Sequence, residues 1–126
     1  MPVRCLIVDD NEDFQRAARE LLERDGICVV DVVSTGAQAY RACRDLKPDV
    51  ALVDLELGEE TGFEVARQIA GRGGSPQPRV ILISTYSEDD FEEMIGDSPA
   101  ISFLPKTGLS GAAIRSILAR AGGPVS

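Results

Sequence analysis

The chain has 126 residues, of which 44% are hydrophobic and 27% charged, so it fits one globular domain with a single core. Its formal net charge of −8 argues against binding to nucleic-acid phosphates, and we expect no direct nucleic-acid contact by this domain. The sequence contains no histidine, which excludes Ser-His and Cys-His nucleophilic sites and zinc sites built on imidazole.

Five short apolar runs predict buried strands, because such runs between turn residues are typical of strands covered on both faces. In chain order they span residues 3–8, 27–33, 50–54, 80–83 and 100–104. Four of these five strands end at polar side chains or run directly into one. The first strand ends at Asp9 and Asp10, the third at Asp54, and the fourth at Ser84, while the fifth runs through Pro105 into Lys106.

Apolar residues at helical spacing follow each strand, which predicts five amphipathic helices. Asn11 can cap the first helix and Pro48 ends the second, while the fourth is a short helix over residues 87–95. Strands and helices that alternate in this way form a parallel sheet with helices on both faces, because crossovers between parallel strands are right-handed. Pro105 removes one backbone donor, which places the fifth strand at the edge of the sheet or makes it irregular.

The carboxyl ends of parallel strands share one edge, so the polar side chains that end the strands are expected to meet there. Two carboxylates about 4 Å apart repel by roughly 4 kcal/mol at an effective dielectric near 20, so three of them together call for a cation. Oxygen ligands without nitrogen or sulfur favour Mg²⁺. An aspartate nucleophile beside Mg²⁺, a lysine and a hydroxyl suits an acyl phosphate.

These residues make the chain similar to the receiver domains of two-component response regulators, over about residues 3–121. The similarity rests on five ordered elements: Leu6-Ile7-Val8-Asp9-Asp10, Leu52-Val53-Asp54 with Gly62 downstream, Ile83-Ser84, Phe103 and Lys106. It implies a flavodoxin-like (βα)5 doubly wound sheet of order 2-1-3-4-5, with a receiver over residues 1–121 and a tail or linker stub over 122–126. The run Ser84-Thr85-Tyr86, with Pro105 before rather than after Lys106, most resembles LuxR/NarL-type receivers, which are attached to DNA-binding domains of transcription regulators.

The resemblance also assigns roles to the residues of the edge. It implies that Asp54 accepts a phosphoryl group from a histidine kinase. Magnesium would be held by Asp54, Asp10 and the backbone carbonyl of Glu56, with Asp9 acting through water. Ser84 and Lys106 would contact the phosphoryl group.

A switch and a docking surface follow from the same resemblance. Phe103 would be the aromatic switch. The fourth helix, fifth strand and fifth helix would form an exposed surface for a homodimer or another partner, and its apolar residues would be Phe91, Met94, Ile95 and Phe103. We further hypothesise that Glu56 and Tyr86 set the lifetime of the phosphoaspartate by controlling an attacking water.

Other functions remain open from the sequence. The Asp54-x-Glu56 pattern fits a small aspartate-nucleophile phosphohydrolase, although a second aspartate is usual in those enzymes, and we expect no enzyme activity beyond the chain's own phosphorylation and dephosphorylation. A degenerate receiver that binds partners without phosphorylation is disfavoured by the intact acidic cluster. A flavin or nucleotide site is disfavoured because no glycine-rich phosphate loop follows the first strand.

The cysteines and the apolar stretches of the sequence indicate where in the cell the protein is found. Cys5, Cys28 and Cys43 lie in apolar or helical contexts without a CxxC pattern, which indicates buried, reduced thiols. The apolar run at the N-terminus is too short for a signal peptide, and no later stretch is long enough to span a membrane. We therefore expect a cytoplasmic protein without membrane contact.

Overall fold

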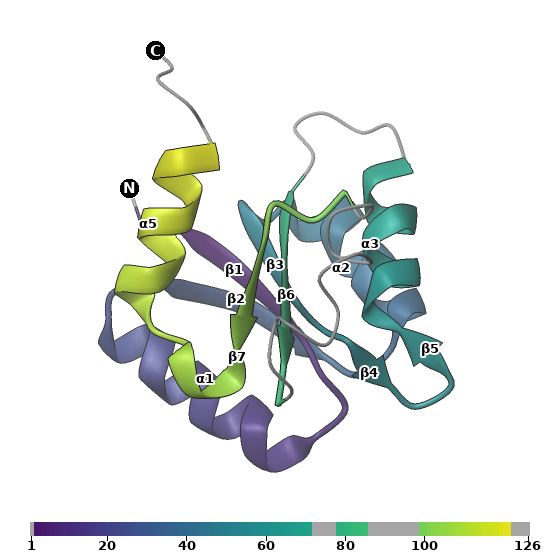
Figure 1. The fold of residues 1–126 in the computed structure, drawn as a ribbon, viewed down its shortest axis with the longest axis horizontal. Coiled ribbons are helices and arrows are strands. Elements are labelled where there is room, and N and C mark those ends of the chain that lie inside the picture. Colours follow the sequence, from purple (N-terminus) through teal and green to yellow (C-terminus); the bar gives the residue numbers. More distant parts are fainter. Residues whose placement is uncertain (1, 72–77, 86–98, 122–126) are drawn as a thin grey trace.

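Five parallel strands form one sheet between two layers of helices (Figure 1). The structure is a computed structural model that describes residues 2–71, 78–85 and 99–121. The long strands are β1 (Arg4–Val8), β2 (Cys28–Val33), β3 (Val50–Asp54), β6 (Arg79–Ser84) and β7 (Ser102–Pro105). Their order is β2-β1-β3-β6-β7, which confirms the predicted order because β6 and β7 are the fourth and fifth strands of the sheet.

Four α-helices and one short 3-10 helix lie in the described part of the chain. They are α1 (Glu12–Arg24), α2 (Gly36–Leu46), α3 (Gly62–Gly71), η2 (Lys106–Gly108) and α5 (Gly111–Ala121). The Asn11 side chain caps α1 by accepting a hydrogen bond from the backbone N–H of Phe14, as the sequence predicted. The helix predicted over residues 87–95 lies outside the described residues.

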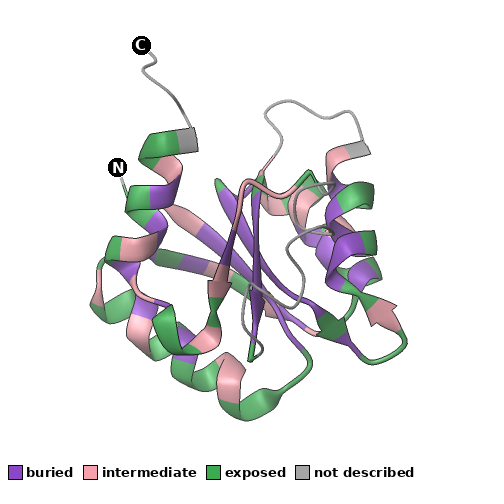
Figure 2. Cartoon of the chain, viewed as in Figure 1, coloured by how far each residue is buried: buried purple, intermediate pink, exposed green. Residues whose placement is uncertain are grey.

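Successive residues of the central strands face opposite layers, so the sheet has two cores (Figure 2). One core includes Leu6 and Val53 and is covered by α2 and α3, and the other includes Ile7 and Leu52 and is covered by α1 and α5. All five residues of β3 are buried. The central position of β3 therefore places Asp54, its last residue, at the middle of one sheet edge.

The segment after β3 contains two short strands, whereas the sequence predicted no strand between residues 54 and 80. Residues Glu56–Leu57 form β4 and residues Glu60–Thr61 form β5, and the two pair antiparallel as a small hairpin. Gly58 lies in the turn between them with a φ of 66°, in the left-handed region that glycine adopts without strain. The hairpin returns the chain to the sheet edge directly after Asp54.

Two details differ from the sequence expectations and one agrees. The fifth strand starts at Ser102 rather than at residue 100, and it includes Pro105. This strand lies at the edge of the sheet, where proline is tolerated, as Pro105 predicted. Of the three cysteines predicted to be buried, Cys5 is buried and Cys43 is only half-buried, while the prediction was wrong for Cys28, the first residue of the opposite edge strand β2, which is exposed.

Among the described residues, none of the helices combines the length and the apolar character that a membrane-crossing segment requires.

Candidate functional site

The carboxyl ends of the strands bring the predicted polar side chains to one edge of the sheet, at the bottom of Figure 1. Asp9 and Asp10 follow β1 directly, and Asp54 is the last residue of β3. Val8 pairs with Val53 in the parallel ladder, so Asp9 and Asp54 leave neighbouring strands at the same level. Lys106 follows β7 and begins η2. The sequence prediction that these four side chains meet is confirmed.

Lys106 binds two carboxylates at this edge. Its Nζ lies 2.7 Å from Asp9 Oδ2 and 3.4 Å from Asp54 Oδ2. The contact with Asp9 is a close ion pair, and Nζ also donates a long hydrogen bond to Asp54. The Asp9 side chain is completely buried, and those of Asp54 and Lys106 are 9% and 13% exposed. The low dielectric of this setting strengthens both contacts.

Backbone donors fix the two buried carboxylates. The N–H of Asn11 donates to Asp9 Oδ1 at 2.8 Å, and the N–H of Glu56 donates to Asp54 Oδ1 at 3.2 Å. Each carboxylate therefore has one oxygen held by its own loop and the other turned toward Lys106.

Burial and charge shift the pKa values of this group. Burial and, to a smaller extent, the neighbouring charge of Asp9 raise the pKa of Asp54 to about 6, against the opposing effects of the Glu56 N–H and Lys106. Burial on its own would lower the pKa of Lys106, but its contacts with Asp9 and Asp54 raise the pKa above its usual value. The lysine is therefore a cation at neutral pH, and Asp54 is a more basic carboxylate than usual.

The acidic side chains fit a divalent cation. Asp9, Asp10 and Asp54 each offer one carboxylate oxygen, and these atoms all lie within 4.8 Å of one another. Opposite ligands of an octahedral Mg²⁺ are about 4.2 Å apart, because each bond is about 2.1 Å long. Asp10 is exposed, which leaves the group open to solvent on one side. The donor set, oxygen only, is the one that Mg²⁺ prefers.

Gly62 allows the hairpin to return close to Asp54. Its N–H donates to the carbonyl of Leu55 at 2.9 Å. A Cβ at this position would lie 2.4 Å from the backbone oxygen of Asp54, closer than two such atoms approach. This explains physically why a glycine follows the third strand at this distance.

The other predicted residues have mixed outcomes. Ser84 is buried at the end of β6, one residue beyond Ile83, the ladder partner of Asp54. The Glu56 side chain is exposed. Phe103 is only 7% exposed and packs into the core under α2 and α3, so the expectation that its ring contributes to an exposed docking surface was wrong. Tyr86, Phe91, Met94 and Ile95 lie outside the described residues.

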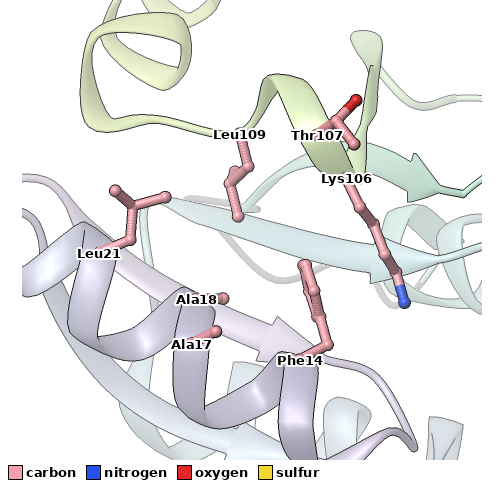
Figure 3. Close-up of a pocket in the computed structure, with 7 residues that line it drawn as sticks. All are labelled: Phe14, Ala17, Ala18, Leu21, Lys106, Thr107 and Leu109. Carbon is pink, nitrogen blue, oxygen red and sulfur yellow. The ribbon is translucent and has the colours of Figure 1, made fainter.

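Three side chains at this edge were missed by the sequence analysis. Phe14 places its ring under the Lys106 ammonium, 4.2 Å from centroid to Nζ (Figure 3). Gln15 Nε2 donates to the carbonyl of Asp9 and, at 3.1 Å, to Ser34 Oγ. Glu60 of the hairpin accepts from the N–H of Gly36 at the start of α2, at 3.0 Å. Phe14 belonged to a predicted apolar stripe, but no sequence pattern showed which residue its ring would meet.

The arrangement suits the transfer of a group that carries negative charge. An accessible cluster of carboxylate oxygens, a buried carboxylate with a raised pKa and a fixed ammonium converge at one edge, where they could neutralise charge that develops in such a transfer.

Comparisons with known proteins agree with this chemistry. The family model for the response regulator receiver domain matches residues 5–118. The chain is 36% identical over 109 residues to a protein-glutamate methylesterase/protein-glutamine glutaminase of Alkalilimnicola ehrlichii, and 30% identical over 106 residues to the transcriptional regulatory protein LiaR of Bacillus subtilis. These matches cover 84% and 83% of this chain, but 27% and 49% of the two proteins. The chain thus spans between a quarter and a half of the length of these curated relatives.

Solved structures give the same result over almost the full chain. The signal receiver domain of the response regulator NarL from Mycobacterium tuberculosis is similar with a TM-score of 0.80 at 27% identity, covering 97% of this chain and 98% of that one. A LuxR-family two-component response regulator from Aurantimonas sp. SI85-9A1 gives a TM-score of 0.82 at 26% identity, covering 98% of this chain and 87% of that one. Since the family match spans most of the residues and the fold agrees from end to end, this chain belongs to the response regulator receiver domain family of two-component systems.

Proposed function

We propose that Asp54 is the phosphoacceptor of this receiver. The observation that carries the proposal is the shared ion-pair network in which Lys106 Nζ contacts both Asp9 and Asp54 at the carboxyl edge of the sheet. A carboxylate oxygen of Asp54 attacks the phosphorus of a phosphohistidine on a histidine kinase. The new O–P bond forms as the P–N bond breaks, and the leaving imidazole takes a proton from solvent. Acetyl phosphate can serve as a small donor in place of the phosphohistidine, in which case its P–O bond to the acetyl group breaks and acetate leaves.

Lys106 and Ser84 would then hold the transferred group. The ammonium lies 3.4 Å from Asp54 Oδ2 and stays charged at neutral pH, so it can pair with a phosphoryl oxygen attached there. Ser84 ends the strand beside Asp54, where its hydroxyl can donate to another phosphoryl oxygen. The charges of these groups are in place before the reaction, which lowers the cost of reorganisation.

We propose that the acidic cluster holds Mg²⁺ through Asp9, Asp10, Asp54 and the backbone carbonyl of Glu56. A bound Mg²⁺ supplies charge neutralisation for the incoming phosphoryl oxygens. The exposed Asp10 and the oxygen-only donor set support this assignment. Asp9 keeps its position through the Asn11 N–H and Lys106, so it orients the cluster from the buried side.

The lifetime of the phosphoaspartate is proposed to depend on Glu56 and Tyr86. Glu56 is exposed two residues beyond Asp54, where a carboxylate can orient a water that attacks phosphorus. Replacing Glu56 with Asn should change the rate of phosphate loss, and an unchanged half-life would reject this role.

Phosphorylation is proposed to switch the surface formed by residues 87–95, β7 and α5. The phosphoryl group adds roughly one negative charge at the edge, toward which Ser84 and Lys106 shift. In the β6–β7 ladder Ser84 pairs with Pro105, two residues beyond Phe103, so a shift of Ser84 bears directly on the strand that carries the Phe103 ring. The surface would then bind a second copy or another partner.

The setting of the domain is also a proposal. We place the receiver at residues 1–121, with 122–126 as a tail or linker stub, in a cytoplasmic regulator that contacts neither membrane nor nucleic acid through this domain. LuxR/NarL-type relatives support an attached DNA-binding output. The methylesterase relatives carry their named activity in a protein of which this chain matches about a quarter, so an enzymatic output would belong to another domain.

The test is to incubate the chain with MgCl2 and acetyl phosphate and to measure intact mass. We expect one added phosphoryl group per chain, dependent on Mg²⁺ and absent in Asp54→Asn. The matched control is Asp45→Asn on the exposed face of α2, which should be labelled as the wild type is. Continuous release of phosphate from simple phosphate esters would instead favour the phosphohydrolase alternative, and no adduct with any donor would overturn the proposal.

A further inference from the structure

Lys106 has a third partner besides the two carboxylates. Its Nζ lies over the ring of Phe14, 4.2 Å from the centroid. An ammonium at this distance from an aromatic face is attracted by the negative potential of the ring. The side chain of Lys106 has many rotamers, so contacts that restrain its end determine where the charge is held.

Phe14 is itself held in place. It lies in the first turn of α1, where its N–H donates to the capping side chain of Asn11 at 3.0 Å. The ring packs against the core on the α1 and α5 side of the sheet. It also borders an apolar pocket of about 250 Å³, whose other lining residues are Ala17, Ala18, Leu21, Thr107 and Leu109 together with Lys106 (Figure 3).

We propose that Phe14 is a positioning residue for phosphoryl transfer: its ring holds the Lys106 ammonium at the place where it meets the transferred phosphoryl group. The inference rests on the proposed function, because it assumes that Lys106 contacts that group. Phe14 belongs to α1, far from Lys106 along the chain, and its hydrocarbon ring cannot itself exchange protons or bind a metal, so we infer that it acts on the reaction through its contact with the lysine.

The ring limits the freedom of the ammonium without competing for the phosphoryl oxygens, because it offers no charge and no strong acceptor. Its loss would let Nζ sample positions away from Asp54. Labelling of Asp54 by acetyl phosphate should then slow about fivefold in Phe14→Leu, the size expected for a partly buried cation–π contact. Phe14→Tyr keeps an aromatic face and should stay within about twofold of the wild type.

A merely structural role for Phe14 is separated by two further experiments. Leu21→Ala enlarges the same pocket from the same helix and should lower stability while leaving the labelling rate within about twofold. Site-specific fluorination of Phe14, with one, two and three fluorines, changes ring size little but withdraws electron density from its face, so the labelling rate should fall stepwise.

A spectroscopic measurement reports the contact independently of the reaction. In NMR spectra the ε-methylene protons of Lys106 should be shifted upfield by the Phe14 ring current, and the shift should be lost in Phe14→Leu and kept in Phe14→Tyr. Equal labelling rates across the fluorinated series, or an equal slowing in Leu21→Ala, would overturn the inference while labelling of Asp54 stands. If no donor labels the wild type at Asp54, the proposed function fails and the role of Phe14 fails with it, whatever the NMR shift.

Discussion

The stability of the folded chain depends on pH through the carboxyl group of Asp54. Its pKa is about 6 in the folded chain, against 3.8 for an ordinary aspartate. A carboxyl whose pKa is raised by folding binds its proton more tightly in the folded state. Its contribution to stability is therefore fully present below about pH 3.8 and is lost as the pH rises through about 6.

Replacing the Asp54 carboxyl with an amide should remove this loss of stability at neutral pH. In EDTA at pH 7.5, Asp54→Asn is expected to be more stable than the wild type by about 1–3 kcal/mol, because the amide carries no buried charge. The difference should shrink as the pH falls toward 4. Urea unfolding at several pH values measures this, and a difference that stays constant over that range would show that titration of the carboxyl is not its cause.

The positive charge of Lys106 offsets the cost of burying the carboxylates of Asp9 and Asp54. Lys106→Met should destabilise the metal-free protein by about 3 kcal/mol at pH 7, since it leaves the completely buried Asp9 carboxylate without its partner. The loss should be smaller at pH 5, because Asp54, whose pKa is about 6, is then largely protonated and adds no second uncompensated charge. Lys106→Arg, which keeps the charge, serves as the control in the same denaturation series. A loss of equal size at both pH values would point to packing instead.

At the scale of single elements, the position of α3 depends on Gly62, because a glycine there allows the helix to begin close to the end of β3. Gly62→Ala should cost about 1–3 kcal/mol, because the new Cβ meets backbone atoms of Asp54 and Leu55 rather than movable side chains. The displaced Asp54 should also bind Mg²⁺ more weakly. Titration calorimetry and thermal unfolding measure the two effects. Glu64→Ala, on the exposed side of the same helix, should change neither by much.

The side chains of Asp25 and Arg115 join the end of α1 to α5, and Arg115 donates to the backbone carbonyl of Asp25. Asp25 Oδ2 accepts from the N–H of Gly111 at 2.8 Å, which ties the end of α1 to the start of α5. Asp25→Ala should therefore cost about 1–2 kcal/mol of stability and leave Mg²⁺ affinity unchanged. Asp25→Asn keeps the acceptor oxygen and should recover most of the loss. Chemical denaturation of the three proteins decides the matter, and full stability of the alanine variant would show that the tie is unimportant.

For the molecule as a whole, Mg²⁺ should act as a ligand of the folded state only. At a hundred times its dissociation constant it is expected to add about 2.7 kcal/mol to the free energy of unfolding. Asp10→Asn removes an exposed ligand at little structural cost, so it should abolish most of this gain while the metal-free stability stays within about 0.5 kcal/mol. Thermal unfolding with and without MgCl2 tests both statements.

Patterns within the sequence predicted most of this architecture. The apolar run before Asp54 predicted a strand covered on both faces, and all five of its residues are buried. The positions of Asp9, Asp54 and Lys106 at or just after strand ends predicted that their side chains lie close together, because the carboxyl ends of parallel strands share one edge of the sheet. The hairpin after Asp54 escaped prediction, since strands of two residues have no periodicity.

Patterns in the sequence could not predict contacts between side chains of segments that lie far apart along the chain. The Phe14 stripe predicted only an inward face, and the position of its ring under Lys106 depends on how α1 and η2 pack together. Cys28 and Phe103 were placed wrongly for the same reason. Whether an apolar residue of an edge strand is covered depends on what packs over that strand, and spacing along the chain does not show it.

The order in which the charges occur along the chain has a consequence for biosynthesis. All three acids of the cluster are translated before Lys106, which follows Asp54 by 52 residues. A nascent polypeptide that has emerged only as far as β3 therefore carries the three carboxylates without Lys106, the cation that contacts Asp9 and Asp54 in the folded domain. Unless a divalent ion is captured on the ribosome, the domain would complete its folding only when the last strand emerges.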